Sequence, residues 1–130
     1  MKLVIIAVGT RMPSWVTEGY REYARRMPPG TTLELLEVKA ESRTSGKTVA
    51  QMLAAEAQRI RAVLPKGGRV IALDERGKDL STCGLAVQLE AWMQERGPLV
   101  FVIGGADGLD AELKKTAALQ LRLSGMTLPH

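Results

Sequence analysis

Short apolar runs alternate along the chain with longer segments in which apolar residues recur every three or four positions. Five runs rich in Val, Ile and Leu predict β-strands, at residues 3–8, 32–38, 69–74, 99–103 and 119–123. The runs at 3–8 and 99–103 are apolar on consecutive positions, which is typical of strands that are covered on both faces. The pattern therefore predicts a sheet that lies between layers of helix.

Four segments between these strands have the spacing of amphipathic helices. We place the N-cap of the first at Ser14 and its end before Pro28, because proline stops a helix. The second spans residues 48–64, the third starts at Ser81 and the fourth spans 110–116. The stripes that should face the sheet in the first three helices are Val16, Tyr20, Tyr23 and Met27; Val49, Met52, Leu53, Ile60 and Leu64; and Leu85, Leu89, Trp92 and Met93.

The regular alternation of strand and helix predicts the fold class. Strands separated by helices of this length form a mostly parallel sheet through right-handed crossovers, with helices on both faces. We therefore expect one three-layer α/β domain over residues 1–130, with a five-stranded sheet and no second domain. In such sheets ligands bind at the carboxyl ends of the strands. The candidate regions are residues 9–10, the segment after Val38, residues 73–78, residues 104–108 and everything after Leu123.

Composition and charge exclude several classes of protein. Apolar residues make up 45% of the chain and charged residues 25%, which is typical of a globular domain and not of a disordered chain. The single cysteine, Cys83, rules out an intramolecular disulfide and favours a cytoplasmic location. No apolar stretch approaches the ~20 residues of a membrane-spanning helix, so we expect no membrane partner. The formal net charge of +4 is compatible with a polyanionic partner without requiring one.

A glycine-rich segment directly after the fourth predicted strand is the clearest candidate for a ligand site. Gly104, Gly105 and Gly108 follow one another closely there, and glycine lets main-chain atoms approach a ligand. The spacing differs from Gly-x-Gly-x-x-Gly, so the segment is not a dinucleotide-binding fingerprint. An ordinary tight turn between strand and helix is the alternative interpretation of this segment taken alone.

Two further patterns argue against other chemistries. Residues 45–48 read Ser-Gly-Lys-Thr, as at the end of a phosphate-binding loop, but Glu41 stands where that motif requires glycine. We interpret the stretch as a polar loop that leads into a helix. His130 is the only histidine, so we expect no metal site and no Ser-His-Asp triad.

Clusters of charge give weaker indications. The neighbouring carboxylates of Asp74 and Glu75 suggest metal or acid–base chemistry, yet the basic residues that follow favour a solvated charged turn over residues 73–78. A second cluster suggests either a surface that contacts phosphates or a solvated helix face. Its members are Arg21, Arg25, Arg26, Lys39, Arg43 and Lys47.

Four motifs, in order along the chain, resemble one known family. They are the opening Met-Lys-Leu followed by Val-Gly-Thr at 8–10, Leu-Asp-Glu-Arg-Gly-Lys at 73–78, Ile-Gly-Gly-Ala-Asp-Gly at 103–108, and Leu-Arg-Leu-Ser-Gly-Met-Thr-Leu-Pro-His at 121–130. Through these motifs the whole chain resembles the RlmH-type methyltransferases of large-subunit ribosomal RNA, which are members of the knotted SPOUT superfamily.

The resemblance implies a homodimeric enzyme that uses S-adenosyl-L-methionine and methylates N3 of pseudouridine 1915 of 23S rRNA in the assembled ribosome. Carried over by position, its cofactor-binding residues are Leu73, Gly104, Leu123, Ser124, Gly125, Met126, Thr127 and Leu128. Small-molecule sites are mostly apolar with a few main-chain contacts, and these residue types supply both. Transfer of a methyl group from a sulfonium requires no metal.

No catalytic residue is assigned from the sequence. Loss of the N3 proton calls for a base or for a group that stabilises the resulting anion, and Asp107, Arg122 and His130 are the polar residues near the expected site. In members of the family the chain continues past Leu-Pro-His as a helix and tail that thread the knot. Since the sequence here stops at His130, we expect these 130 residues alone to form a weakened or inactive enzyme.

Two other classes of function stay open at this point, a non-catalytic nucleotide- or RNA-binding α/β adaptor and a structural protein that is an obligate dimer. The chain has two Trp, two Tyr and one Phe, too few for an aromatic-rich RNA-binding sheet. RNA recognition would then depend on phosphate contacts and on the shape of the ribosome. Binding of S-adenosylmethionine or S-adenosylhomocysteine distinguishes the enzyme from both alternatives.

Overall fold

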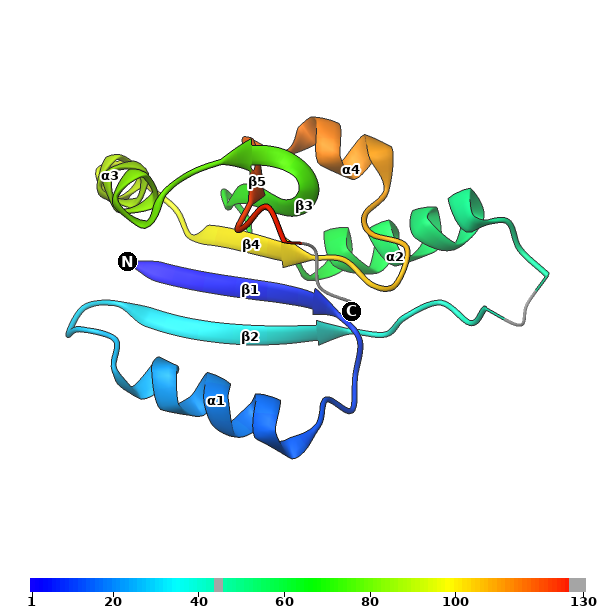
Figure 1. The fold of residues 1–130 in the computed structure, drawn as a ribbon, viewed down its shortest axis with the longest axis horizontal. Helices are drawn as coiled ribbons and strands as arrows, with labels where there is room; N and C mark the ends of the chain where they lie inside the picture. The colour runs from blue at the N-terminus through cyan, green and yellow to red at the C-terminus, as the bar shows by residue number, and fades with distance from the viewer. Residues whose placement is uncertain (44–45, 127–130) are drawn as a thin grey trace.

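The computed structural model describes residues 1–43 and 46–126, in which strands and helices alternate as predicted (Figure 1). The elements are, in chain order, β1 (Lys2–Val8), α1 (Ser14–Arg25), β2 (Thr32–Val38), α2 (Val49–Val63), β3 (Arg69–Asp79), α3 (Thr82–Met93), β4 (Leu99–Ile103), α4 (Ala111–Thr116) and β5 (Leu119–Arg122). No helix of the described residues is long and apolar enough to cross a membrane.

The five strands form one sheet in the order β2-β1-β4-β3-β5, and each neighbouring pair is parallel. In this order, the connections from β1 to β2 and from β3 to β4 run toward the β2 edge of the sheet. The connections from β2 to β3 and from β4 to β5 run toward the β5 edge. Right-handed crossovers therefore place α1 and α3 on one face and α2 and α4 on the other. The predicted three-layer α/β fold with a parallel sheet is confirmed. The knot that the resemblance implies stays a prediction.

The core consists of two apolar clusters, one on each face of the sheet. On the face covered by α2 and α4 the buried residues are Val4, Ile6, Val8, Val38, Ala57, Ile60, Ala72, Val100, Val102, Leu109 and Leu113. On the opposite face they are Ile71, Trp92, Leu99 and Leu121, with Leu80, Leu85 and Leu89 packed against them. Because side chains alternate along a strand, consecutive apolar residues of β4 enter different clusters. This double burial explains the unbroken apolar run at 99–103.

Three residues of the predicted helix stripes are exposed, namely Tyr23, Val49 and Met93. Val49 is the first residue of α2 and Met93 the last of α3, so both lie at helix ends. Tyr23 points away from the sheet, where the guanidinium of Arg26 lies 5.3 Å from the centre of its ring. The N-cap of α1 is Pro13 and not Ser14, and no side chain caps that helix.

The predicted charged turn at 73–78 is wrong, because β3 continues through it to Asp79 (Figure 1). Leu121 of β5 pairs with both Leu73 and Lys78, so residues 74–77 bulge out of the ladder. Gly77 makes this possible: a Cβ atom there would lie 2.7 Å from the main-chain carbon of Leu121. The bulge gives β3 a sharp curve beside the end of β4.

Candidate functional site

A cleft of about 940 Å³ lies at the carboxyl ends of β4 and β5, beside the bulge of β3. Its walls come from residues 73–76, from 103–109 and from the end of β5 with the residues that follow it. After Ile103 the chain leaves β4 toward α4 on one face, whereas β3 continues past Leu73 through its bulge and then leads to α3 on the other face. The cleft lies between these two diverging segments. Its apolar side chains are those of Leu73, Ile103, Ala106, Leu109, Leu121, Leu123 and Met126.

The structure brings most of the predicted cofactor residues together in this cleft. Five of them line it: Leu73, Gly104, Leu123, Ser124 and Met126. Gly125 lies between two of these along the chain but is not among the lining residues, and Thr127 and Leu128 lie outside the described residues. Residues 9–10, also a candidate region, do not line the cleft. The role of all eight residues in cofactor binding stays a prediction.

The glycine-rich segment folds back on itself where it lines the cleft. The main-chain N–H of Gly108 donates to the carbonyl of Gly105 at 3.0 Å, and Gly108 has a φ of 82°. A Cβ atom on Gly104 would lie 2.5 Å from the carbonyl oxygen of Gly108. The segment is thus a tight turn, as the alternative interpretation held, and it also presents bare main chain to the cleft. The two interpretations are compatible.

Ion pairs engage several of the charged residues around the cleft. Nζ of Lys114 lies 3.6 Å from Oδ2 of Asp74. Arg122 donates to both carboxylate oxygens of Asp79, with its Nε 2.8 Å from Oδ1. This hydrogen bond holds the pKa of Asp79 below its usual value, although burial acts in the opposite direction, and it raises the pKa of Arg122. A guanidinium is not deprotonated in proteins, so Arg122 is not a candidate for the base.

Metal chemistry finds no support among these carboxylates. Within residues 1–43 and 46–126, no group of three or more His, Cys, Asp or Glu side chains is placed to hold a metal ion. Glu75 is exposed, and Asp74 faces a lysine. The structure gives no support to metal or acid–base chemistry at Asp74 and Glu75.

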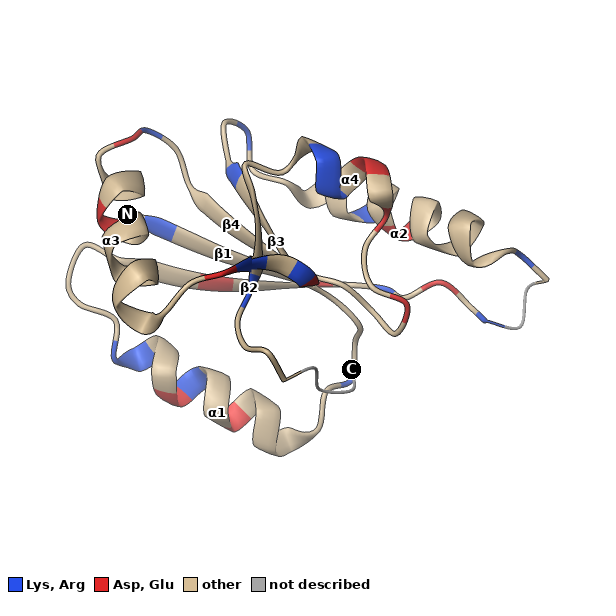
Figure 2. Ribbon diagram, turned by 45° about the horizontal axis from the view of Figure 1, so that its top comes forward, with Lys and Arg blue, Asp and Glu red and all other residues tan. Residues whose placement is uncertain are grey.

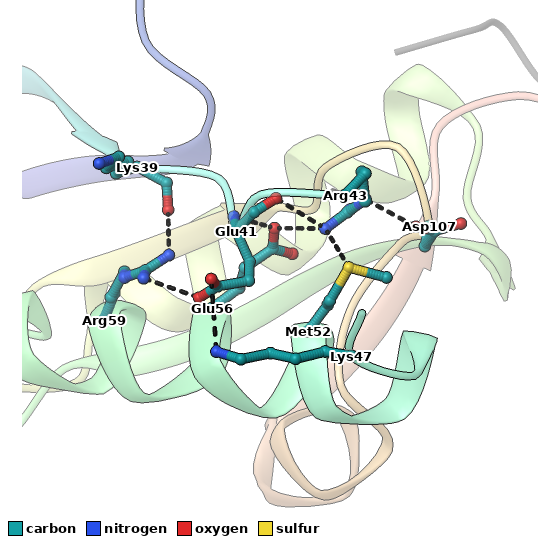
Figure 3. A network of polar contacts seen from close by, with 8 residues as sticks. All are labelled: Lys39, Glu41, Arg43, Lys47, Met52, Glu56, Arg59 and Asp107. Atoms are coloured by element: carbon teal, nitrogen blue, oxygen red, sulfur yellow. Dashed lines mark hydrogen bonds and ion pairs between the residues drawn. The ribbon is translucent and has the colours of Figure 1, made fainter. Parts of the chain in front are cut away.

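The segment after Val38, also a candidate region, does not line the cleft but contacts its glycine-rich wall, a contact that the sequence did not indicate. Nε of Arg43 lies 3.1 Å from Oδ2 of Asp107, in the middle of the glycine-rich segment (Figure 3). The same arginine pairs with Glu56 of α2, which is only 2% exposed. Sequence reasoning missed Glu56, although it lies four residues from Met52 and four from Ile60 on the apolar stripe of α2.

Four of the six basic residues of the proposed phosphate-contacting surface, Arg43 among them, form ion pairs with other described residues. Arg25 and Arg26 both pair with Glu22 on α1, and Lys47 pairs with Glu41 at 3.5 Å. Figure 2 shows basic and acidic segments close together on α1, on α4 and in the segment before α2. For Arg25 and Arg26 the structure thus favours the alternative, a solvated helix face.

Comparison with known proteins gives consistent matches over the whole chain. The model of one family, described as predicted SPOUT methyltransferase, matches residues 1–130. The chain is 58% identical to a protein of Ralstonia pickettii (strain 12J), 58% identical to one of Bordetella avium (strain 197N) and 55% identical to one of Burkholderia multivorans. Each of these relatives is named ribosomal RNA large subunit methyltransferase H, and each alignment covers all of this chain and 83% of the relative. The chain therefore belongs to the SPOUT methyltransferase family.

Proposed function

We propose that this protein is a cytoplasmic, homodimeric methyltransferase that uses S-adenosyl-L-methionine to methylate N3 of pseudouridine 1915 of 23S rRNA in the assembled ribosome. The family is one of methyltransferases, and relatives at 55–58% identity are named for large-subunit ribosomal RNA. The observation that carries the proposal is the cleft, which gathers Leu73, Gly104 and the residues after β5 at one edge of the sheet.

The size and lining of the cleft suit a nucleoside cofactor. Small-molecule sites typically measure about 300–1,000 Å³ and have mostly apolar walls, and this cleft of about 940 Å³ meets both conditions. Apolar side chains such as Leu73, Leu123 and Met126 would hold the adenine, and the main chain of Gly104 and Gly105 leaves room for the amino-acid part. Ser124, Gly125, Thr127 and Leu128 complete the proposed set.

The cofactor supplies a methyl group bonded to a positively charged sulfur. The main task of the protein is to hold N3 of the base in line with that bond, and orientation of this kind can supply on the order of 7–11 kcal/mol of the barrier. The N3 proton must also leave. Asp107 is ion-paired with Arg43 and Arg122 with Asp79, so neither is poised to accept it, and His130 lies outside the described residues. We therefore assign no catalytic base.

Calorimetric titration with S-adenosylhomocysteine, followed by transfer of a labelled methyl group to purified ribosomes, tests the proposal. We expect saturable binding, label in 23S rRNA, and twice the mass of one chain by light scattering. Mapping the modified nucleotide tests the assignment to N3 of pseudouridine 1915. Ribosome association without cofactor binding would support the adaptor instead. Absence of both ribosome association and cofactor binding would favour a structural protein.

A further inference from the structure

A buried carboxylate lies directly behind the glycine-rich segment. Oε2 of Glu56 accepts a hydrogen bond from the main-chain N–H of Glu41 at 2.9 Å and lies 3.3 Å from Nη1 of Arg43. Oε1 is buried and has no hydrogen-bond partner among the described residues. Because a buried charge is costly unless it is paired, this carboxylate depends on its cation. Among the ion pairs of the described residues, that cation is Arg43.

Arg43 connects the buried carboxylate to the cleft (Figure 3). Its Nε lies 3.1 Å from Oδ2 of Asp107. Its Nη1 also donates to the main-chain oxygen of Glu41 at 3.1 Å and to Sδ of Met52 at 3.5 Å. One guanidinium thus joins the segment after β2, helix α2 and the glycine-rich segment. A planar guanidinium can serve several acceptors at once, whereas the ammonium of a lysine acts as a point charge.

The segment that Arg43 reaches has little room to move inward. A Cβ atom on Gly105 would lie 3.2 Å from Cγ1 of Val8 and 3.8 Å from Oε1 of Glu56. Val8 and Glu56 therefore form the floor beneath the segment, and Arg43 holds it from the side through Asp107. Arg43 itself does not line the cleft, whereas Asp107 does.

We propose that Arg43 is a positioning residue for cofactor binding. Its ion pair with Asp107 holds residues 104–108 in the shape that forms the cleft wall, and Glu56 in turn fixes Arg43. The inference rests on the proposed function, because it assigns the cleft to S-adenosylmethionine. Arg43 acts through Asp107 and has no contact of its own with the cofactor. Its Nε and Nη1 are engaged within the protein, which favours this internal role over a phosphate contact.

The chain offers a matched control in the same network. Arg59 donates to the main-chain oxygen of Lys39 at 3.0 Å and to Oε2 of Glu41 at 2.8 Å. It therefore resembles Arg43 in charge and in having a carboxylate partner, but within the described part of the chain it has no ion pair with the glycine-rich segment. Loss of affinity in Arg43→Gln that is absent from Arg59→Gln shows that the effect is specific to Arg43, and Asp107→Asn, which keeps the pair with Glu56, isolates the link to the glycine-rich segment.

The first measurement is the affinity of the full chain for S-adenosylhomocysteine by calorimetry. We expect Arg43→Gln and Asp107→Asn each to weaken binding by about tenfold or more, because small displacements of a positioning group are costly. The affinity of Arg43→Lys should lie between those of these variants and that of the wild type. The double variant of Arg43→Gln with Asp107→Asn should lose little more affinity for S-adenosylhomocysteine than either single variant, since both substitutions remove the same contact. In the methylation assay the KM for the cofactor should rise more than kcat falls.

The second measurement is amide hydrogen exchange in the absence of ligand. Exchange at residues 104–109 should be faster in Arg43→Gln and Asp107→Asn and unchanged in Arg59→Gln. If Arg43→Gln fails to fold, Asp107→Asn and Arg43→Lys carry the test, because both leave Glu56 facing a cation. Wild-type affinity and wild-type exchange in these variants would overturn the inference. A wild type that does not bind S-adenosylhomocysteine would overturn the proposed function, and exchange alone would then decide the role of Arg43.

Discussion

Arg122, the last residue of β5, donates hydrogen bonds to both carboxylate oxygens of Asp79, the last residue of β3. The two residues are also direct partners in the strand register. The pair therefore closes the β3–β5 ladder just beyond the bulge of residues 74–77. It fixes the strand end from which residues 123–126 pass along the cleft.

This pair predicts a pH-dependent part of the stability. The hydrogen bond from Arg122 holds the pKa of Asp79 below its ordinary value of 3.8, against the effect of burial. A carboxylate with a lowered pKa in the folded state stabilises the protein above its unfolded pKa and loses that effect as the pH falls through the folded one. Urea denaturation should therefore show a smaller decrease in the free energy of unfolding below pH ~4 in Asp79→Asn than in the wild type.

Glu112→Gln is a suitable control for this experiment. The side chain of Glu112 is 74% exposed, and its Oε1 lies 3.5 Å from Nζ of Lys115 within the short helix α4. Exposed pairs of this kind contribute little, so this variant should follow the wild-type pH profile. Identical profiles for Asp79→Asn and the wild type would show that the Arg122 pair does not stabilise the fold.

The bulge of β3 should depend on Gly77. A Cβ atom there would meet main-chain atoms of Gln120 and Leu121 at 2.7–2.8 Å, and backbone cannot rotate out of the way. We expect Gly77→Ala to lower the free energy of unfolding by about 1–3 kcal/mol, as overpacking does. In Gly125→Ala the new methyl group meets open space, so urea denaturation should give the wild-type value. Equal stability of the two variants would contradict the β3–β5 packing.

Gly104 tests whether the cleft is the cofactor site. A side chain at this position would collide with the carbonyl of Gly108 at 2.5 Å and displace the glycine-rich segment. We expect Gly104→Val to abolish binding of S-adenosylhomocysteine in calorimetry while the helical signal in circular dichroism stays intact. Unchanged affinity would place the cofactor elsewhere.

Gly19→Ala supplies the counterpart to that variant. Gly19 lies inside α1 with nothing within 4 Å of its Cβ position. Replacing a helical glycine by alanine gains up to about 1 kcal/mol, so this variant should be slightly more stable and bind S-adenosylhomocysteine as the wild type does. A loss of affinity in this variant would show that α1 affects the cofactor site.

The sequence was sufficient to predict the order of elements, because the periods of strand and helix are local properties. It was not sufficient for contacts that depend on distant segments. Arg43 and Asp107 are far apart in the chain, and only the parallel arrangement of β2, β1 and β4 brings their segments together. The extension of β3 depends likewise on Gly77 packing against β5.

Glu56 was missed for a different reason. Its spacing of four from Met52 and from Ile60 places it on the buried stripe of α2, and this spacing is visible in the sequence. A charged residue in such a stripe is normally assumed to lie at its edge, since burial of an unpaired charge is unfavourable. Only the partner, Arg43, makes the burial acceptable, and no local pattern identifies that partner.

The final prediction concerns the RNA substrate. Arg76 lies in the bulge of β3 at the edge of the cleft, is exposed, and has no ion pair among the described residues. If it contacts a phosphate, Arg76→Gln should weaken ribosome binding and lower the slope of log K against log salt by about 1. Arg25→Gln removes an equal charge that is already paired with Glu22 on α1, so it should leave the slope nearly unchanged.

The wild type should bind free RNA fragments weakly and in a salt-dependent way, because recognition depends on phosphates and on ribosomal shape. Tight, salt-insensitive binding to an isolated hairpin would contradict this mode of recognition, whatever the result for Arg76.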